Sequence, residues 1–203
     1  MSMVKYGQGG YDFFPGPLRS AGPETGTTDT SSCISYYRIW KINKWEIDSF
    51  LTWYHDGSLG TGTHTIPEAI ATWPAHGDDT DGFSYCMAPF VDTDTNGIYE
   101  PAQGDYPRIR GTQMLWWVYN DALAPHTEAD SEPLGVEIRA SAYVFGCDTF
   151  SGSNNVLNYT TFLHYEIYNH SHYAYHDCFA GFWTDADLRS EEHTSELQSP
   201  YVI

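Results

Sequence analysis

Hydrophobic and polar residues alternate along the second half of the chain. In residues 136–144, VEIRASAYV, valine, isoleucine and alanine take every second position, and polar residues or tyrosine stand between them. Successive side chains of a strand point to opposite faces of a sheet, so this pattern predicts an antiparallel strand with one buried face. Runs rich in β-branched and aromatic residues, separated by Asn, Asp, Gly and Ser clusters, predict further strands at 113–120, 160–169 and 176–185.

The first half of the chain has a different pattern. Residues 1–34 are rich in Gly, Pro, Ser and Thr, which predicts an extended lead-in. Residues 36–42 have the composition of a strand, while apolar residues at helical spacing predict a helix at 44–54. Flanking prolines bracket a second short helix at 67–73. We therefore predict a mainly β fold, in which short N-terminal helices and long loops accompany an antiparallel, β-sandwich-like sheet.

Charge limits the partners of this chain. Its 203 residues carry 27 acidic and 9 basic side chains, a formal net charge of −18. Nucleic acid and anionic membrane surfaces attract basic proteins, so neither is an expected partner. The acidity suits a protein that binds cations or lies in salty extracellular water, and simple solubility explains it equally well. No apolar stretch is long enough to span a membrane, so no membrane insertion is expected.

Four cysteines are spread widely along the chain, at Cys33, Cys86, Cys147 and Cys178. No C-x-x-C pair suggests a zinc site or redox chemistry, and four cysteines leave three possible pairings open. In an oxidising compartment we expect at least one disulfide. In the cytosol, the alternative is four small buried thiols.

The segment with the most evident chemistry is the acidic stretch at 92–105, DTDTNGIYEPAQGD. Calcium prefers six to eight hard oxygen ligands. Acidic or amide side chains at loop positions 1, 3 and 5 can converge when a glycine at position 6 allows a sharp turn, and the carbonyl of position 7 adds a ligand. This pattern, extended to the two acids that follow, predicts the calcium ligands Asp92, Asp94, Asn96, Ile98 (through its carbonyl), Glu100 and Asp105.

The loop departs from the calcium pattern at position 12, where Gln103 stands in place of a bidentate glutamate. Asp105 is expected to supply the closing carboxylate instead. No helical pattern flanks the loop, which argues against a helix–loop–helix sensor. The alternative interpretation is an acidic turn that holds no metal, because Asp, Asn and Gly are common turn residues.

Other metal candidates are weaker. Asp185 and Asp187 could form a second acidic site at a strand end, although a solvated strand terminus is the simpler interpretation. Histidines crowd into 164–176, where alternate residues of a strand could share a zinc or copper ion. A predicted turn at 169–171 breaks that face, so surface histidines around a hairpin are favoured.

Nothing in the sequence specifies an enzyme. Trp116 and Trp117 must face opposite sides of a strand, and an exposed one could stack on a sugar ring. Carboxylates such as Glu128, Glu132 and Glu137 could pair as the acid and base of a glycosidase, but that requires a separation no sequence can show. The chain contains no G-x-S-x-G, H-E-x-x-H or phosphate-binding glycine loop.

The ends of the chain differ from its body. Residues 189–199 resemble one reading frame of a widely used short-read sequencing adapter, so we expect 189–203 to be a non-native, adapter-derived tail. A single β-rich domain is expected to span 35–188 and to continue in the natural protein. The first ten residues lack the apolar region of a signal peptide, so we expect the chain to be a fragment.

Several segments, in order, resemble a largely uncharacterised family of large secreted proteins of Bacteroidetes, which carry a C-terminal type IX secretion sorting domain. They are DFFPGPL (12–18), YYRIWKINKWEI (36–47), TIPEAIATWPAHGD (65–78), the long run 88–121, 126–145 and FAGFWTDADL (179–188). In that family the acidic loop is similar to D-x-N-x-D-G-I-Y-x-P-x-x-G-D-Y-P, which matches residues 92–107. The resemblance implies export to the cell surface or the medium, and no established activity.

Together these patterns predict a non-enzymatic secreted or cell-surface module with a calcium-stabilised acidic loop, and adhesion is the role expected of such a module. Its expected partners are a calcium ion and surface glycans or other extracellular proteins. The alternative is a carbohydrate-binding or carbohydrate-degrading exoprotein.

Overall fold

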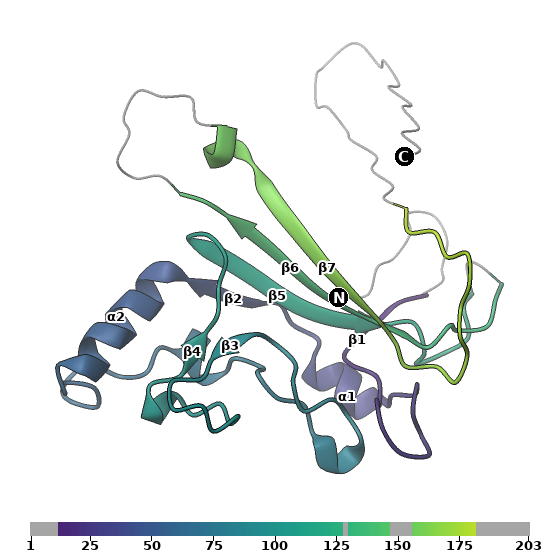
Figure 1. Ribbon diagram of the computed structural model, residues 1–203, viewed down its shortest axis with the longest axis horizontal. Coiled ribbons are helices and arrows are strands. Elements are labelled where there is room, and N and C mark those ends of the chain that lie inside the picture. Colours follow the sequence, from purple (N-terminus) through teal and green to yellow (C-terminus); the bar gives the residue numbers. More distant parts are fainter. Residues whose placement is uncertain (1–11, 128–129, 147–155, 182–203) are drawn as a thin grey trace. The chain divides into compact units, whose positions relative to one another are not determined.

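The structure is a computed structural model that describes residues 12–127, 130–146 and 156–181 (Figure 1). The chain divides into two units, one ending at His172 and the other beginning at Tyr173. All described helices and strands belong to the first unit. In the second unit, the described residues 173–181 contain no helix or strand, so the strand predicted at 176–185 is not seen over its described part. The predicted tail at 189–203 lies outside the described residues.

An antiparallel sheet of five strands forms the centre of the first unit (Figure 1). Its strands are β1 (Phe14–Pro15), β2 (Trp40–Asn43), β5 (Gln113–Asn120), β6 (Val136–Val144) and β7 (Thr161–Asn169). β5 pairs with β6 along one edge and with both β1 and β2 along the other, and β7 pairs with the far edge of β6. The three long strands predicted in the second half are confirmed, and so is the mainly β, antiparallel class.

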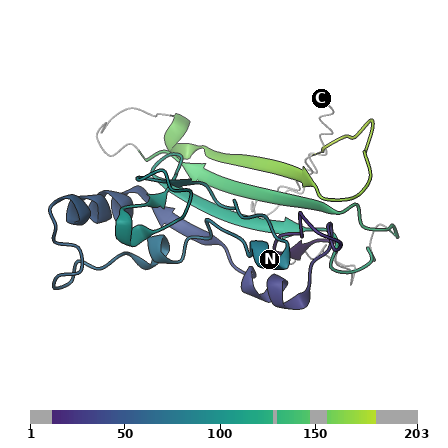
Figure 2. The same ribbon diagram turned by 60° about the horizontal axis from the view of Figure 1, so that its bottom comes forward.

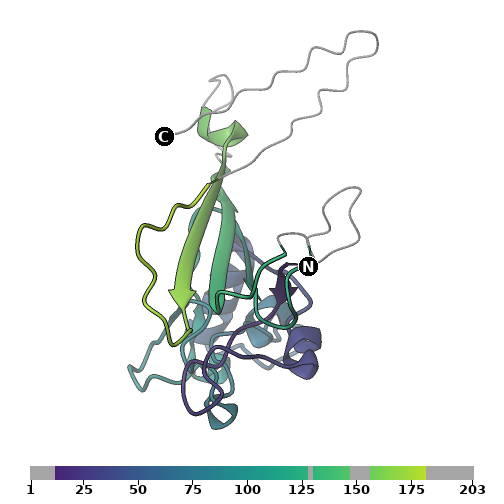
Figure 3. The same ribbon diagram turned by 90° about the vertical axis from the view of Figure 1, so that its right-hand side faces the viewer.

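Helices and loops cover one face of this sheet, as Figures 2 and 3 show for the purple and blue N-terminal segments. The helices of this layer are α1 (Thr30–Ser35), α2 (Lys44–His55) and α3 (Glu68–Ala71), with the 3-10 turns η1 (Asp79–Asp81) and η2 (Pro101–Gln103). A further 3-10 turn, η3 (Val156–Tyr159), directly precedes β7. The other sheet among the described residues is a hairpin of two short strands, β3 (Phe90–Val91) and β4 (Tyr106–Pro107). The described residues therefore do not show the predicted sandwich of two large sheets.

Local sequence explains where the helices begin. The Glu46 carboxylate accepts hydrogen bonds from the backbone and the side chain of Asn43, at 2.9 and 2.7 Å, and so ties the first turn of α2 to the residue before it. This helix matches the one predicted at 44–54. The predicted helix at 67–73 is shorter, and it begins after Pro67.

The segment predicted as an extended lead-in is instead part of the fold over its described residues. β1 pairs with β5, and Leu18 is completely buried. Helix α1 also lies in this segment, where the side chain of Asp29 accepts the backbone N–H of Ser32 at 2.8 Å. Gly and Pro signalled turns correctly, but two-residue strands and a six-residue helix are too short to leave a periodic pattern.

The hydrophobic core lies between the sheet and the helical layer. It consists of apolar side chains from β2, β5, α2, α3 and the loops that follow α3, including Trp40, Ile42, Phe50, Ile70, Trp73, Met87, Met114, Trp116 and Val118. Trp116 is 3% exposed and belongs to this core, whereas Trp117 lies on the opposite face of β5 and is half-buried. The predicted division of the two tryptophans between opposite faces is confirmed.

Strand β6 turns its polar face, not its apolar face, toward the covering layer. Glu137 and Arg139 on that face are 0% and 6% exposed. Glu137 Oε1 accepts a hydrogen bond from Arg139 Nε at 2.6 Å, and its Oε2 accepts the backbone N–H of Leu18 at 2.8 Å. The alternation of the sequence therefore identified the two faces, but not which of them the N-terminal layer covers.

Burial alone would raise the pKa of Glu137. The neighbouring His170, whose Nε2 lies 3.4 Å from Glu137 Oε2, together with the Arg139 charge and the Leu18 N–H, outweighs burial and holds the pKa of this carboxyl below its usual range. Glu137 is therefore ionised at neutral pH, as one half of a buried ion pair that joins the sheet to the N-terminal segment.

Candidate functional site

The acidic loop predicted from the sequence connects β3 to β4 and is fixed at its base. The Tyr54 hydroxyl of α2 donates to the Gln103 carbonyl at 2.7 Å, and the Thr93 hydroxyl donates to the Gly104 carbonyl at 2.9 Å. Gly104 has φ +100°, and a Cβ at this position would lie 2.7 Å from the Tyr54 ring. Only glycine suits this conformation and this close approach, so the loop packs directly against the helix.

Four predicted ligands gather in the outer part of the loop. The Asn96 side-chain nitrogen donates to Asp94 Oδ2 and to Glu100 Oε2, each at 3.0 Å. Asp92 joins them by accepting the backbone N–H groups of Asn96 and Gly97, at 3.3 and 2.7 Å. The side chains at loop positions 1, 3, 5 and 9 are therefore connected within one hydrogen-bonded cluster.

The turn that gathers these side chains depends on positive backbone angles. Thr95 has φ 61° and Gly97 has φ 82°, which bends the chain sharply between the acidic positions. The Gly97 N–H, the strongest of several donors to Asp92, holds the pKa of that carboxyl below its usual range despite partial desolvation. Asp92 is consequently an anion at neutral pH, which is the form a cation requires.

The remaining two predicted ligands, Ile98 and Asp105, make contacts of a different kind from those of the four clustered side chains. The Ile98 N–H donates to Asn96 Oδ1 at 2.7 Å, while the Ile98 side chain is 48% exposed. Asp105 is 1% exposed and accepts the backbone N–H of Thr93 at 2.8 Å and that of Glu100 at 2.9 Å. It thus closes the base of the loop. The ligand roles of the Ile98 carbonyl and the Asp105 carboxylate stay predictions.

Within the described ranges, no three His, Cys, Asp or Glu side chains are placed as a ready metal-binding group. The acidic loop combines carboxylates with an amide, and its Asn96 amide nitrogen lies between two carboxylates. A cation in the loop would therefore displace this nitrogen or turn the amide so that its oxygen faces the ion. The donor set fits calcium, which accepts carboxylate, amide and carbonyl oxygens in flexible geometry.

Two of the histidines considered as metal ligands, His164 and His170, have different partners in the first unit. His164 Nε2 lies 3.2 Å from Glu166 Oε1 on β7, whereas His170 lies beside the buried Glu137. The suggested pairing of Glu137 with another carboxylate is not supported either, because Glu137 is completely buried and bound to Arg139. Glu128, Asp185 and Asp187 lie outside the described residues.

The described cysteines are not bonded to one another. Cys33 is buried, and Cys86 and Cys178 are exposed free thiols. Cys147 lies outside the described residues, so the predicted disulfide stays a prediction. The part of the chain that is described contains no helix long and apolar enough to cross a membrane.

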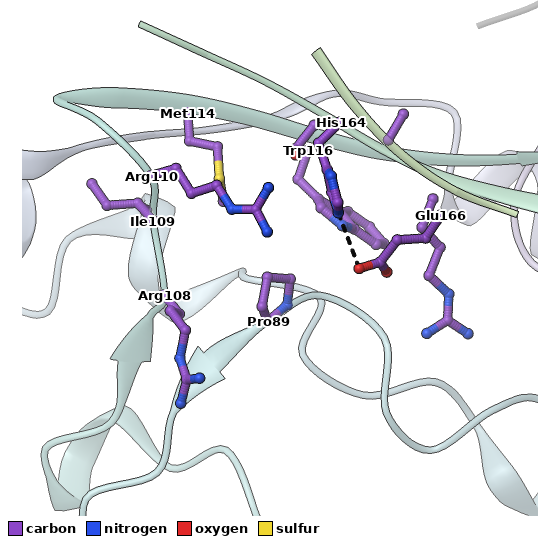
Figure 4. A pocket seen from close by; sticks show the side chains of 11 residues that line it. Pro89, Arg108, Ile109, Arg110, Met114, Trp116, His164 and Glu166 are labelled. Carbon is purple, nitrogen blue, oxygen red and sulfur yellow. Dashed lines mark hydrogen bonds and ion pairs between the residues drawn. The ribbon is translucent and has the colours of Figure 1, made fainter. Parts of the chain in front are cut away.

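Sequence reasoning missed a small cleft on the covered side of the sheet (Figure 4). Residues of β5, β6 and β7 form one wall, and Pro89 and the segment 108–110, which flank the β3–β4 hairpin, form the other. The cleft has a volume of about 230 Å³. One signal in the sequence could have indicated this cleft. Two arginines stand in an R-I-R run shortly after the acidic loop, in a chain with few basic residues.

Comparison with models of known protein families, with well-characterised proteins and with solved structures finds no match to this chain.

Proposed function

We propose that loop 92–105 binds a calcium ion, and that this ion stabilises a non-enzymatic module that acts outside the cell or at its surface. The observation that carries the proposal is the position of the Asn96 amide nitrogen, 3.0 Å from a carboxylate oxygen of Asp94 and from one of Glu100. A weakly positive N–H donor holds two anions together where a divalent cation would hold them more strongly. Asp92, an anion in the same turn, adds a third carboxylate.

Calcium suits the loop better than magnesium. Magnesium requires near-ideal octahedral geometry and keeps most of its water, whereas calcium accepts many protein oxygens at varied angles. The exposed loop offers only a few charged ligands, which is typical of extracellular modules with dissociation constants of about 10⁻⁴–10⁻³ M. Such sites fill at extracellular calcium concentrations. The resemblance of several segments to exported proteins supports the same location.

Calcium is expected to raise the thermal stability of the protein. A ligand at about 100 times its dissociation constant stabilises the folded state by about 2.7 kcal/mol, which raises the melting temperature of a chain this long by roughly 5–10 °C. Melting curves in calcium, in magnesium and in chelator measure this shift, and magnesium should give a much smaller one.

A matched pair of variants locates the calcium effect. Asp94→Asn should abolish most of the shift, whereas Asp79→Asn, the same change at an exposed aspartate in η1, should leave it intact. An equal melting temperature in calcium and in chelator would rule out the calcium site and leave an acidic turn.

A second candidate function is carbohydrate binding, favoured by an aromatic hollow on the other face of the sheet. Its cavity of about 140 Å³ is lined by Phe13, Tyr36, Arg38, Trp117, Val118, Tyr119 and Tyr165. Aromatic faces with a few polar groups suit the C–H faces of sugar rings. Glycan-array binding that is lost in Trp117→Ala would support this function, and binding unaffected by that change would exclude the hollow.

A further inference from the structure

The cleft of Figure 4 gathers basic side chains in an acidic protein. Lys and Arg number nine in the whole chain, against 27 acidic residues, and three of the nine line this one cavity. Arg139 is committed to Glu137 at 2.6 Å and to the Cys86 carbonyl at 2.7 Å. Arg108 and Arg110 are exposed, and neither forms an ion pair with a carboxylate of the described residues.

The two unpaired arginines differ in direction. The guanidinium of Arg110 extends into the cleft toward Trp116 and His164, whereas that of Arg108 points away from it (Figure 4). Arg110 also lies 5.8 Å from the centre of the Tyr143 ring, which helps to hold its side chain over the sheet. Arg110 is therefore the donor available inside the cleft, and Arg108 adds positive potential from outside.

The opposite wall offers hydrogen-bond acceptors. Glu166 Oε1 lies 3.2 Å from His164 Nε2, and Glu166 Oε2 accepts the Tyr168 hydroxyl at 3.0 Å. Each carboxylate oxygen has two lone pairs, so Glu166 can accept further hydrogen bonds from a ligand. Between the two walls, Pro89 and Trp116 provide apolar surface.

From these features we infer that the cleft binds a small hydroxylated carboxylate, of the size and chemistry of one uronic acid unit. The planar guanidinium of Arg110 matches a carboxylate with two parallel hydrogen bonds. Glu166 on the other wall accepts hydroxyl hydrogens, and the apolar surface contacts the C–H face of the ring. The volume of about 230 Å³ lies below the roughly 300–1,000 Å³ typical of sites for drug-sized ligands. One sugar unit fits this limit.

Titration calorimetry with galacturonate tests the inference. The measurement is made in chelator, so that calcium in the acidic loop cannot bridge to the ligand and a failure of the calcium proposal leaves the test unaffected. Galacturonate should bind, galactose should not, and acetate should bind more weakly than galacturonate. The natural ligand could be a free uronic acid or the end of a uronic acid chain, and a galacturonate trimer distinguishes the two. The trimer should bind as well as the monomer or better when the natural ligand is a chain end. The trimer should bind worse than the monomer when the natural ligand is a free acid.

Variants assign the binding to the cleft. Arg110→Ala should weaken galacturonate binding at least about tenfold, because it removes a charge-assisted pair of hydrogen bonds. Lys41→Ala, which removes one positive charge from the exposed side of β2, should not weaken it. Glu166→Ala should weaken galacturonate binding without weakening acetate binding. Equal affinity for galacturonate and galactose, or unchanged affinity in Arg110→Ala, would overturn the inference.

Discussion

Replacing Arg139 by methionine is expected to lower the free energy of unfolding by about 3–5 kcal/mol, because it leaves a buried carboxylate without its partner. Glu137 is 0% exposed, and Arg139 Nε is its partner at 2.6 Å. The Cys86 carbonyl would lose one of its two donors in the same variant and keep the Ser84 hydroxyl. Urea unfolding curves of the variant and the parent protein measure the difference.

The double variant Glu137→Gln with Arg139→Met isolates the cause. Glutamine carries no charge, and its oxygen can still accept the Leu18 N–H. The double variant should therefore be clearly more stable than Arg139→Met alone. Lys44→Met breaks an exposed pair on α2 and should cost less than about 1 kcal/mol. A loss in Arg139→Met as small as that control would show that Glu137 does not depend on its partner.

Replacing Asp105 by alanine is expected to cost about 2–4 kcal/mol even in chelator. The change leaves the backbone N–H groups of Thr93 and Glu100 without their acceptor. A fully buried donor left unsatisfied costs about 1–3 kcal/mol, and these two part-buried donors together fall toward the lower end of that range for each. Asp105→Asn keeps one acceptor oxygen and should lose roughly half as much. Unfolding curves in chelator measure both losses.

The same variant distinguishes closing the loop from binding a metal. Tyr54→Phe serves as the reference, because it loosens the base of the loop without removing a ligand. The loss in Asp105→Ala should grow from chelator to calcium by about as much as the loss in Tyr54→Phe when Asp105 only closes the loop, and by clearly more when Asp105 also coordinates the ion. Asp94→Ala, at the exposed end of the loop, should change stability little in chelator. Full stability of Asp105→Ala in chelator would contradict the role that its hydrogen bonds indicate.

Local pattern was enough to predict the main elements. β5, β6 and β7 are each eight or nine residues long and rich in β-branched and aromatic residues, and α2 carries apolar residues at helical spacing. The short elements β1 and α1 escaped detection, although Asp29 before a run of Thr and Ser is a recognisable helix start.

The burial of Glu137 and Arg139 could not be predicted from local sequence. A period of two shows which residues share a face, but the layer that covers the face comes from residues far away in the sequence: Leu18 is 119 positions from Glu137, and Cys86 is 53 positions from Arg139. Polar residues on a strand normally indicate the solvent side. Here an ion pair and backbone contacts satisfy them in the interior.

The candidate sites show the same limit. Asp92, Asp94 and Asn96 are close in sequence, so the spacing alone predicted that they gather. The closing contact of Asp105 and the cleft depend on tertiary packing: the cleft joins Pro89, Arg110 and Glu166 from separate parts of the chain. Only the R-I-R run after the acidic loop hinted at that second site.

The anchored base of the acidic loop bears on the thermodynamics of the proposed calcium binding. Fixing one backbone residue costs roughly 1–2 kcal/mol of conformational entropy, and a free loop would lose this for each residue that the ion orders. Tyr54 and Asp105 already hold the base of this loop in place in the folded protein. The affinity for a cation therefore depends mainly on relieved repulsion between carboxylates and on the water the ion sheds. A change that loosens Tyr54, such as Tyr54→Phe, would weaken binding without touching a ligand.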